Sequence, residues 1–261
     1  MADLPVFTKV EVYNRYRGGA LISWELHPLF PVTAPITFTV EVSRSGVGDW
    51  QTVGTVVNGY SLTDTSRWLY GKLPRLHYRV SFTQDAVTNV SDSTQVDGIL
   101  AGKDLRMARE MIRKERLRLR LWGICGLLYK RRRWGVRCPE CIDWDTGQVK
   151  NNHCDVCYGT GFTGGYFDPV EYFVSENTGS THRQVTDPGR GQVVDKILSA
   201  RGIKCPWLDT GDFWVDSDSD MRYVIQTISE VAIRGVTIVF PQIEMRLAPS
   251  TDIIYSIERP S

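Results

Sequence analysis

The sequence lacks any long hydrophobic run. Its 261 residues contain no uninterrupted apolar stretch near the roughly 20 residues that a membrane-spanning helix needs. The first ten residues, MADLPVFTKV, also lack the apolar core of a secretory signal. We therefore expect a protein that is made in the cytoplasm and has no membrane contact.

Recognisable catalytic motifs are absent as well. Histidine is scarce, at four residues, and His27, His77, His153 and His182 lie in unrelated contexts. No Gly-x-Ser-x-Gly element, phosphate-binding loop or dinucleotide fingerprint occurs. The sequence therefore favours a non-enzymatic protein without a small-molecule substrate.

Net charge is nearly zero, at +1, but this average hides an uneven distribution. Residues 103–137 contain 13 Lys or Arg against three acidic residues, so this segment carries +10 and the remainder −9. Such a density of cations favours contact with phosphate or with an acidic protein; the alternative is a solvated helix face. The candidate contact residues are Arg116, Arg118, Arg120, Lys130, Arg131, Arg132 and Arg133.

The first hundred residues alternate between apolar and polar positions, which predicts half-buried strands. The expected strands are Val6–Tyr13, Ala20–Leu26, Ile36–Ser43, Trp50–Val56, Tyr60–Thr63, Leu76–Thr83 and a weak one near Val96. Seven short strands in about 90 residues favour a β-sandwich. Alternation places Ile22, Trp24 and Leu26 on one face of the second strand.

Trp24, together with Leu73-Pro74 and Tyr78, makes residues 4–98 resemble a fibronectin type III domain. In that family a tryptophan of the second strand fills the core, and a tyrosine follows a leucine and proline at the corner before the sixth strand. The resemblance implies a spacer or docking module. The alternative is a packed sandwich without a site.

The pattern changes after Gly98. From Leu105 to Trp122 there is no Gly or Pro, and Asp104 is a suitable N-cap, so we expect a helix of about 18 residues. A second apolar stretch, Ile124–Tyr129, follows.

Four of the six cysteines form two pairs, Cys138/Cys141 and Cys154/Cys157, separated by 12 residues. Two such pairs supply the four thiolates of a tetrahedral, structural zinc site, with iron or a redox dithiol as alternatives. The glycines that let the chain curl around the metal are Gly159, Gly161, Gly164 and Gly165. We expect His153 to be a loop residue, and Cys125 and Cys205 remain unassigned.

The last third predicts strands again. They are Tyr172–Val174, Gln192–Leu198, Phe213–Asp216, Tyr223–Ile228, Val236–Phe240, Gln242–Leu247 and Ile253–Ile257. A small β-barrel or sandwich fits this pattern. The alternating carboxylates of Asp216, Asp218 and Asp220 resemble a calcium loop, but Met221 stands where that loop needs glycine, so we interpret them as a hairpin turn.

The block Gly211-Asp-Phe-Trp-Val-Asp216, followed by Arg222-Tyr-Val-Ile and Arg234-Gly-Val, resembles the β-barrel of head-closure proteins from tailed bacteriophages. The resemblance covers about residues 100–258. It implies a structural protein of the virion, in the neck or head-to-tail connector. It further implies a homo-oligomeric ring that contacts portal, connector or tail ring proteins and packaged DNA.

The sequence thus predicts a mainly β fold with a central helix. Its expected parts are a fibronectin type III-like sandwich (1–98), a basic helical linker (99–136), a four-cysteine zinc knuckle (137–168) and a β-rich, barrel-like assembly domain (169–261). The first functional hypothesis is the virion connector protein. The alternatives are a nucleic-acid-binding zinc-ribbon protein that uses residues 103–137, and a zinc-dependent enzyme or chaperone.

Overall fold

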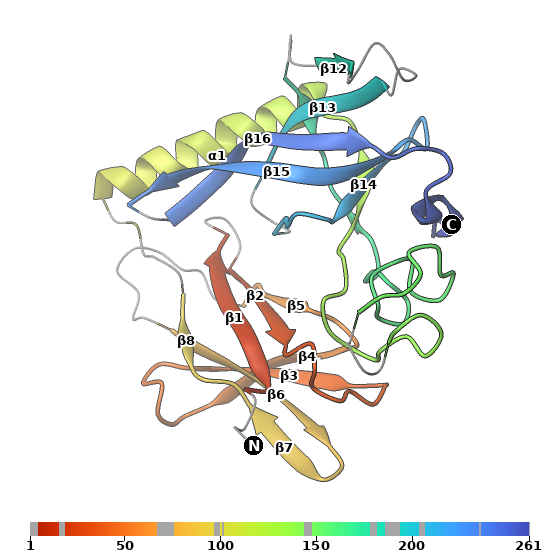
Figure 1. The fold of residues 1–261 in the computed structure, drawn as a ribbon. Coiled ribbons are helices and arrows are strands. Elements are labelled where there is room, and N and C mark those ends of the chain that lie inside the picture. Colours follow the sequence, from red (N-terminus) through yellow and green to blue (C-terminus); the bar gives the residue numbers. More distant parts are fainter. Residues whose placement is uncertain are drawn as a thin grey trace.

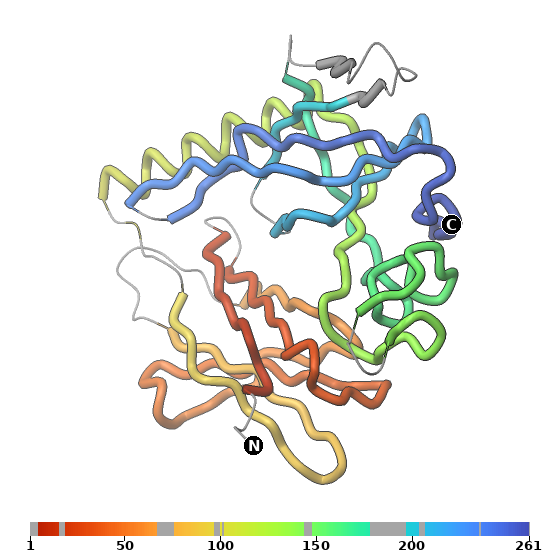
Figure 2. Tube along the Cα trace, viewed as in Figure 1, coloured from red at the N-terminus to blue at the C-terminus, as the bar shows by residue number. Residues whose placement is uncertain are grey.

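The computed structural model describes most of the chain. The described residues are 5–15, 19–66, 76–96, 100, 102–143, 148–177, 182–185, 194–203, 207–234 and 236–260. The predictions for Leu73-Pro74 and for Cys205 lie outside them. Figure 1 and Figure 2 show the N-terminal third on one side of the molecule, the helix and the C-terminal strands on the other, and the cysteine segment beside both.

The N-terminal third is a sandwich of two antiparallel sheets (Figure 1). One sheet has the order β1 (Phe7–Asn14), β2 (Ala20–Leu26), β5 (Ser61–Asp64). The other has the order β4 (Gln51–Val57), β3 (Thr37–Ser43), β6 (His77–Gln84), β7 (Val87–Val90), with β8 (Thr94–Gln95) pairing with β6. The predicted strands are present within one or two residues; β7 was missed because its valines are exposed at a sheet edge.

Alternating side chains of the facing sheets fill the sandwich core. Ile22, Trp24 and Leu26 of β2 are all buried on one face, as predicted, and Trp24 contacts Phe38 of the opposite sheet. The Tyr78 hydroxyl donates a 3.0 Å hydrogen bond to Asp64, which satisfies both polar groups inside the protein. Membership of the fibronectin type III family stays a prediction.

The single α-helix in the described residues, α1 (Gly102–Trp122), begins three residues before the predicted start. The prediction of Asp104 as the N-cap is therefore wrong. Asp104 lies in the first turn, where its charge is favourable to the helix dipole and pairs with Arg234 at 2.7 Å. Ala108 and Ile112 are buried against β16, so only one face of the helix is covered. No helix among the described residues is long and apolar enough to cross a membrane.

The C-terminal part is one curled antiparallel sheet. Its strands are β9 (Gly126–Tyr129), β10 (Val170–Glu171), β11 (Ser175–Glu176), β12 (His182–Val185), β13 (Val194–Ile203), β14 (Phe213–Asp216), β15 (Arg222–Ile233) and β16 (Val236–Leu247). They follow the order β10-β9-β14-β15-β16-β13-β11, and β12 pairs with β13.

The two ends of this strand order belong to one short segment. β10 pairs with β9, and β11, four residues later in the chain, pairs with β13 at the far end of the sheet. Val174 between them bridges to Ile124, so the segment joins the two sides of the curled sheet. Trp214 and Phe240 are buried in its interior. The predicted mainly β fold, with a central helix and a small C-terminal barrel, is confirmed in this curled form.

Three details of the C-terminal prediction are corrected. The predicted strand Tyr172–Val174 is the connection between β10 and β11 and lies outside both strands. The predicted strands Val236–Phe240 and Gln242–Leu247 are one strand, β16. Pro241 does not interrupt it, because the pairing of β16 with both β13 and β15 shifts register at this position and the ladder needs no N–H there. The predicted strand Ile253–Ile257 is a 3-10 helix, η1 (Ile253–Ser256), because Asp252 caps it by accepting from the Ile254 N–H at 3.1 Å.

The acidic stretch Asp216–Asp220 forms the turn between β14 and β15, as predicted. Asp216 accepts hydrogen bonds from the Asp218 N–H and from Ser219, and Arg259 pairs with Asp220 at 2.8 Å. These bonds within the turn hold its shape.

Candidate metal centre

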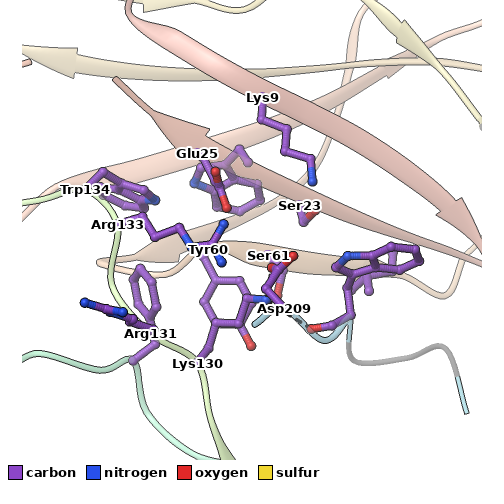
Figure 3. Close-up of a pocket in the computed structure, with 14 residues that line it drawn as sticks. Lys9, Ser23, Glu25, Tyr60, Ser61, Lys130, Arg131, Arg133, Trp134 and Asp209 are labelled. Carbon is purple, nitrogen blue, oxygen red and sulfur yellow. Dashed lines mark hydrogen bonds and ion pairs between the residues drawn. The ribbon is translucent and has the colours of Figure 1, made fainter. Parts of the chain in front are cut away.

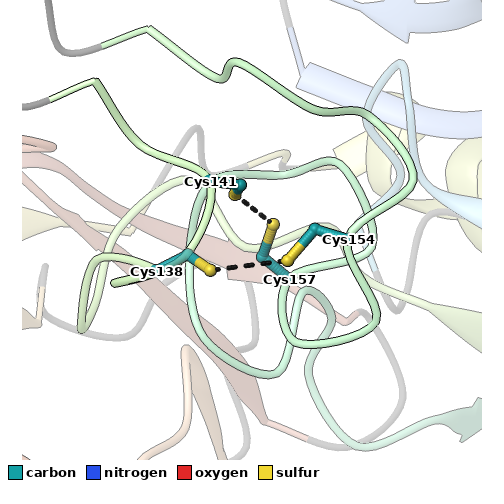
Figure 4. A group of neighbouring side chains, drawn as sticks. All are labelled: Cys138, Cys141, Cys154 and Cys157. Atoms are coloured by element: carbon teal, nitrogen blue, oxygen red, sulfur yellow. Dashed lines mark hydrogen bonds between the residues drawn. The ribbon is translucent and has the colours of Figure 1, made fainter.

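Four cysteine side chains converge at the predicted site (Figure 4). Cys138, Cys141, Cys154 and Cys157 are all buried, and their sulfur atoms lie within 4.8 Å of one another. The Sγ atoms of Cys138 and Cys154 are 3.7 Å apart, and those of Cys141 and Cys157 are 3.0 Å apart. The structure thus brings the two predicted pairs together, and the group can hold one metal ion.

Tight turns place each pair of sulfurs. The Tyr158 N–H donates to the Cys154 carbonyl at 2.7 Å and closes the second turn, while the Lys150 N–H donates to the Cys141 carbonyl at 2.7 Å and ties the loop to the first pair. Gly165 has a φ of +60°, and a side chain there would meet the Cys157 carbonyl at 2.6 Å. A residue with a Cβ cannot occupy this position without displacing the backbone that carries a ligand.

Burial and backbone hydrogen bonds act in opposite directions on the pKa values of the thiols. Burial raises the pKa of Cys138 and that of Cys141, since a thiolate loses hydration inside the protein. Burial also acts to raise the pKa of Cys154, but hydrogen bonds from the backbone N–H groups of Val156 and Cys157 outweigh it and lower that pKa. A cation among these sulfurs would stabilise the thiolate form of all four.

Among the described residues, these cysteines are the one group of His, Cys, Asp or Glu side chains placed to hold a metal. His153 is exposed and outside the group, in agreement with its prediction as a loop residue. Cys125 is also outside it; its thiol is 3.6 Å from Glu171. Since four sulfurs complete a tetrahedral shell, the arrangement leaves no position for substrate or water.

The chain on either side of the cysteines inserts two aromatic rings into the N-terminal sandwich. Trp134 and Phe167 are 2% and 5% exposed and belong to the sandwich core. Trp134 lies 5.5 Å from Phe38 and 5.5 Å from Phe167, and Phe167 lies 4.7 Å from Tyr60. In the sequence Trp134 directly follows the basic run Lys130–Arg133, and no local pattern marks Phe167 as a core residue.

Backbone pairing connects these rings to the four cysteines. The Cys138 N–H donates to the Gly161 carbonyl at 3.0 Å, and the Phe167 N–H donates to the Lys130 carbonyl at 2.9 Å. The stretches 130–138 and 161–167 therefore run side by side. Cys138 lies at one end of this pair of stretches, and Trp134 and Phe167 pack from it against the sandwich. An ordered cysteine site fixes the register of both stretches.

The predicted contact residues 130–133 are engaged in the fold. Lys130 is 7% exposed, and its ammonium donates to Asp209 and, at 3.0 Å, to Asp212. Its predicted role as a surface contact is corrected, because the charge is neutralised inside the protein. The Arg132 guanidinium donates to the Tyr166 carbonyl at 3.0 Å, and Arg133 donates to the Thr210 carbonyl at 3.1 Å.

Lys130 lies beside a cleft where the sandwich, the stretch 130–134 and the C-terminal barrel meet (Figure 3). Burial acts to raise the pKa of Asp209, but Lys130 and then Arg133 lower it below its usual range. Burial raises the pKa of Asp212 and raises that of Tyr60 to about 12. The sequence signal for this cluster was the turn at 209–212, which carries the two carboxylates.

A second direct contact joins the sandwich to the barrel. The rings of Tyr13 and Trp207 are stacked, with centroids 4.4 Å apart and planes 5° from parallel. With the Trp134 and Phe167 insertion, this contact holds the two β-rich parts against each other.

The remaining predicted contact residues lie on α1. Arg118 and Arg120 are exposed and Arg116 is half-buried. Arg118 pairs with Glu115 at 3.6 Å, so part of its charge is balanced within the helix. Contact of these residues with DNA or a partner stays a prediction.

Comparison of the chain with protein-family models and with curated proteins finds no match in either set.

Proposed function

We propose that this chain is a non-enzymatic structural protein of a tailed-phage virion, and that it forms part of an oligomeric ring in the neck or head-to-tail connector. A structural zinc ion at Cys138, Cys141, Cys154 and Cys157 stabilises it. Its partners are copies of itself and the portal, connector or tail ring proteins, with packaged DNA as a further contact.

The observation that carries the structural part of the proposal is the closed cysteine site beside the Trp134 and Phe167 insertion. A catalytic zinc keeps an open coordination position, whereas four buried thiolates fill the tetrahedron. Four sulfurs about 2.3 Å from one zinc are about 3.8 Å from one another. The four sulfurs here all lie within 4.8 Å, with Cys138 and Cys154 3.7 Å apart and Cys141 and Cys157 3.0 Å apart. Iron is the alternative metal for the same donors.

The virion assignment rests on the head-closure resemblance of residues 211–236. Phe213–Val215 of β14 pair with Arg222–Val224 of β15 in the curled sheet, and this short-strand, turn and strand arrangement supports the resemblance. A chain built from two β-rich parts joined by buried aromatic contacts also suits a protein that transmits load between neighbours.

The test is incorporation into particles. A phage whose gene for this chain is disrupted should accumulate DNA-filled heads that lack tails, and the wild-type chain supplied from a plasmid should restore joined particles. A Cys138→Ser chain should fail to restore them, whereas Cys125→Ser, a matched thiol outside the site, should succeed. Normal particles without the chain would contradict the proposal.

A second candidate function, nucleic-acid binding, is favoured by the exposed cations of α1. Binding to phosphates should weaken steeply with salt. Replacing Lys114 and Arg118 with Gln should reduce affinity for duplex DNA and lower the salt slope by up to about two, whereas Lys150→Gln should leave both unchanged. Absence of salt-dependent binding by the wild-type chain would remove this candidate.

A further inference from the structure

The outward side of α1 exposes large apolar side chains among its cations. Met107, Leu117, Leu121 and Trp122 are 52%, 50%, 66% and 77% exposed. Four of the twelve exposed large apolar residues in the described chain thus lie on this one helix, so the exposure is concentrated. A solvated helix face would carry polar residues at these positions.

The same side of the helix carries an excess of positive charge. Over its whole length α1 has eight Lys or Arg and three acidic residues, Asp104, Glu110 and Glu115. Glu110 pairs with Arg113 at 2.7 Å and lies 4.0 Å from Lys114, so a single carboxylate balances the charge of two cations only in part. We define the basic-apolar face as Met107, Arg113, Lys114, Leu117, Arg118, Leu121 and Trp122, which the 3.6-residue period places on one half of the helix.

This composition fits a protein partner better than DNA. The phosphates of DNA attract cations. The DNA backbone offers no apolar surface against which exposed Leu117, Leu121 and Trp122 could be buried. Protein interfaces, in contrast, combine a buried apolar centre with Arg and with aromatic anchors such as Trp. A partner must therefore offer apolar surface together with negative charge.

The chain itself presents such a surface on its barrel. We define the acidic-apolar patch as Val170, Glu171, Phe173 and Asp218, all of them exposed; the neighbouring Asp220 is paired with Arg259 and is not counted in it. Cys125 connects its two parts: the Cys125 carbonyl accepts from the Ser217 N–H at 3.2 Å, and the thiol lies 3.6 Å from Glu171. The patch therefore combines carboxylates with an exposed phenylalanine and valine.

A groove separates the last turn of α1 from this patch. Its apolar walls include Leu119, Phe173 and Ile203, and its charged lining residues are Arg116, Arg120 and Glu171. A groove of this kind can bury an aromatic side chain of a partner, and Trp122 is the most exposed aromatic among the large apolar residues of the described chain.

We infer that the basic-apolar face of one copy docks on the acidic-apolar patch of a second copy of this chain. The partner is a second copy because the two surfaces are complementary in charge, both contain apolar side chains, and the chain outside residues 103–137 carries −9. The inference rests on the proposed function, since it names the surfaces through which the ring would form.

A charge-exchange experiment on the full chain tests the inference. The first variant, Arg113→Glu with Lys114→Glu, reverses charge on the helix face; the second, Glu171→Lys with Asp218→Lys, reverses it on the patch. Arg44→Glu with Lys150→Glu makes the same charge change as the first variant at exposed positions elsewhere. Circular dichroism and zinc content verify that each variant folds, and light scattering measures its mass over a range of concentrations.

Each helix or patch variant alone should need at least about tenfold higher concentration to associate, and an equimolar mixture of the two should associate as well as the wild type. Trp122→Ala should weaken association without any change of charge. A helix variant that associates like the Arg44/Lys150 control, or a mixture that stays dissociated, would overturn the inference.

The outcomes separate this inference from the proposed function. A wild-type chain that forms a ring or joins particles, with association unaffected by these charges, would overturn only the docking surfaces. A helix variant that loses duplex DNA binding but keeps its mass would overturn the inference in favour of a DNA-facing helix. A wild-type chain that stays monomeric and joins no particle would contradict both.

Discussion

Replacing Trp134 with alanine should destabilise the N-terminal sandwich, although Trp134 lies outside it in sequence. The side chain is 2% exposed and lies 5.5 Å from Phe38 of the sandwich. A buried tryptophan covers about 150–250 Å², which at about 25 cal/mol per Å² corresponds to about 4–6 kcal/mol. Measured tryptophan-to-alanine losses in protein cores, about 3–5 kcal/mol, agree with this range.

Urea unfolding followed by far-UV circular dichroism measures this loss, and Trp122→Ala is the matched control. Trp122 is 77% exposed, so its removal should change the free energy of unfolding by no more than about 0.5 kcal/mol. The insertion also predicts coupling to the metal: a chelator should destabilise the sandwich in the wild type and much less in Trp134→Ala. A Trp134→Ala loss below about 1 kcal/mol, or equal chelator effects in both chains, would refute the reasoning.

Three further predictions concern the cysteine site and the buried ion cluster. Elemental analysis should give one zinc per chain, lost in Cys138→Ser and retained in Cys125→Ser, and a metal-free wild type that melts no earlier than the loaded protein would refute the structural role. Lys130→Met should cost about 3–5 kcal/mol in urea unfolding because it leaves the buried Asp212 and the half-buried Asp209 without their cation, whereas exposed Lys114→Met should cost less than about 0.5 kcal/mol; similar losses would contradict the ion cluster. Since the folded-state pKa of Asp209 is lowered, its charge stabilises the protein above its unfolded pKa of about 3.9. The wild type should therefore exceed Asp209→Asn in stability above about pH 4, and the difference should shrink as the pH falls through the lowered pKa; a difference that is constant with pH would contradict this assignment.

Most of the strands and the convergence of the four cysteines were predictable because local spacing determines them. Alternation along Ala20–Leu26 fixes which residues face the core, and the two cysteine pairs need only short turns to converge. The helix start was less predictable. Gly102 has a φ of +57° and is a poor helix former, yet the helix begins there, and Asp104 in the first turn pairs with Arg234 more than 100 residues later.

The contacts between the parts could not be predicted from local pattern. Lys130 stands in a run of four cations that resembles an exposed patch, and only the fold brings Asp209 and Asp212 to it. Trp134 is similar: its neighbours in sequence are polar or glycine, and its partner Phe38 is almost 100 residues away. Pairings at this sequence separation depend on the tertiary arrangement, and a single sequence carries no local signal for them.

Native mass spectrometry of the full chain tests the central claim most directly, because one spectrum reports both the metal content and the number of subunits. We predict a homo-oligomer that carries one zinc ion per chain. A folded, metal-free monomer at every concentration would contradict it.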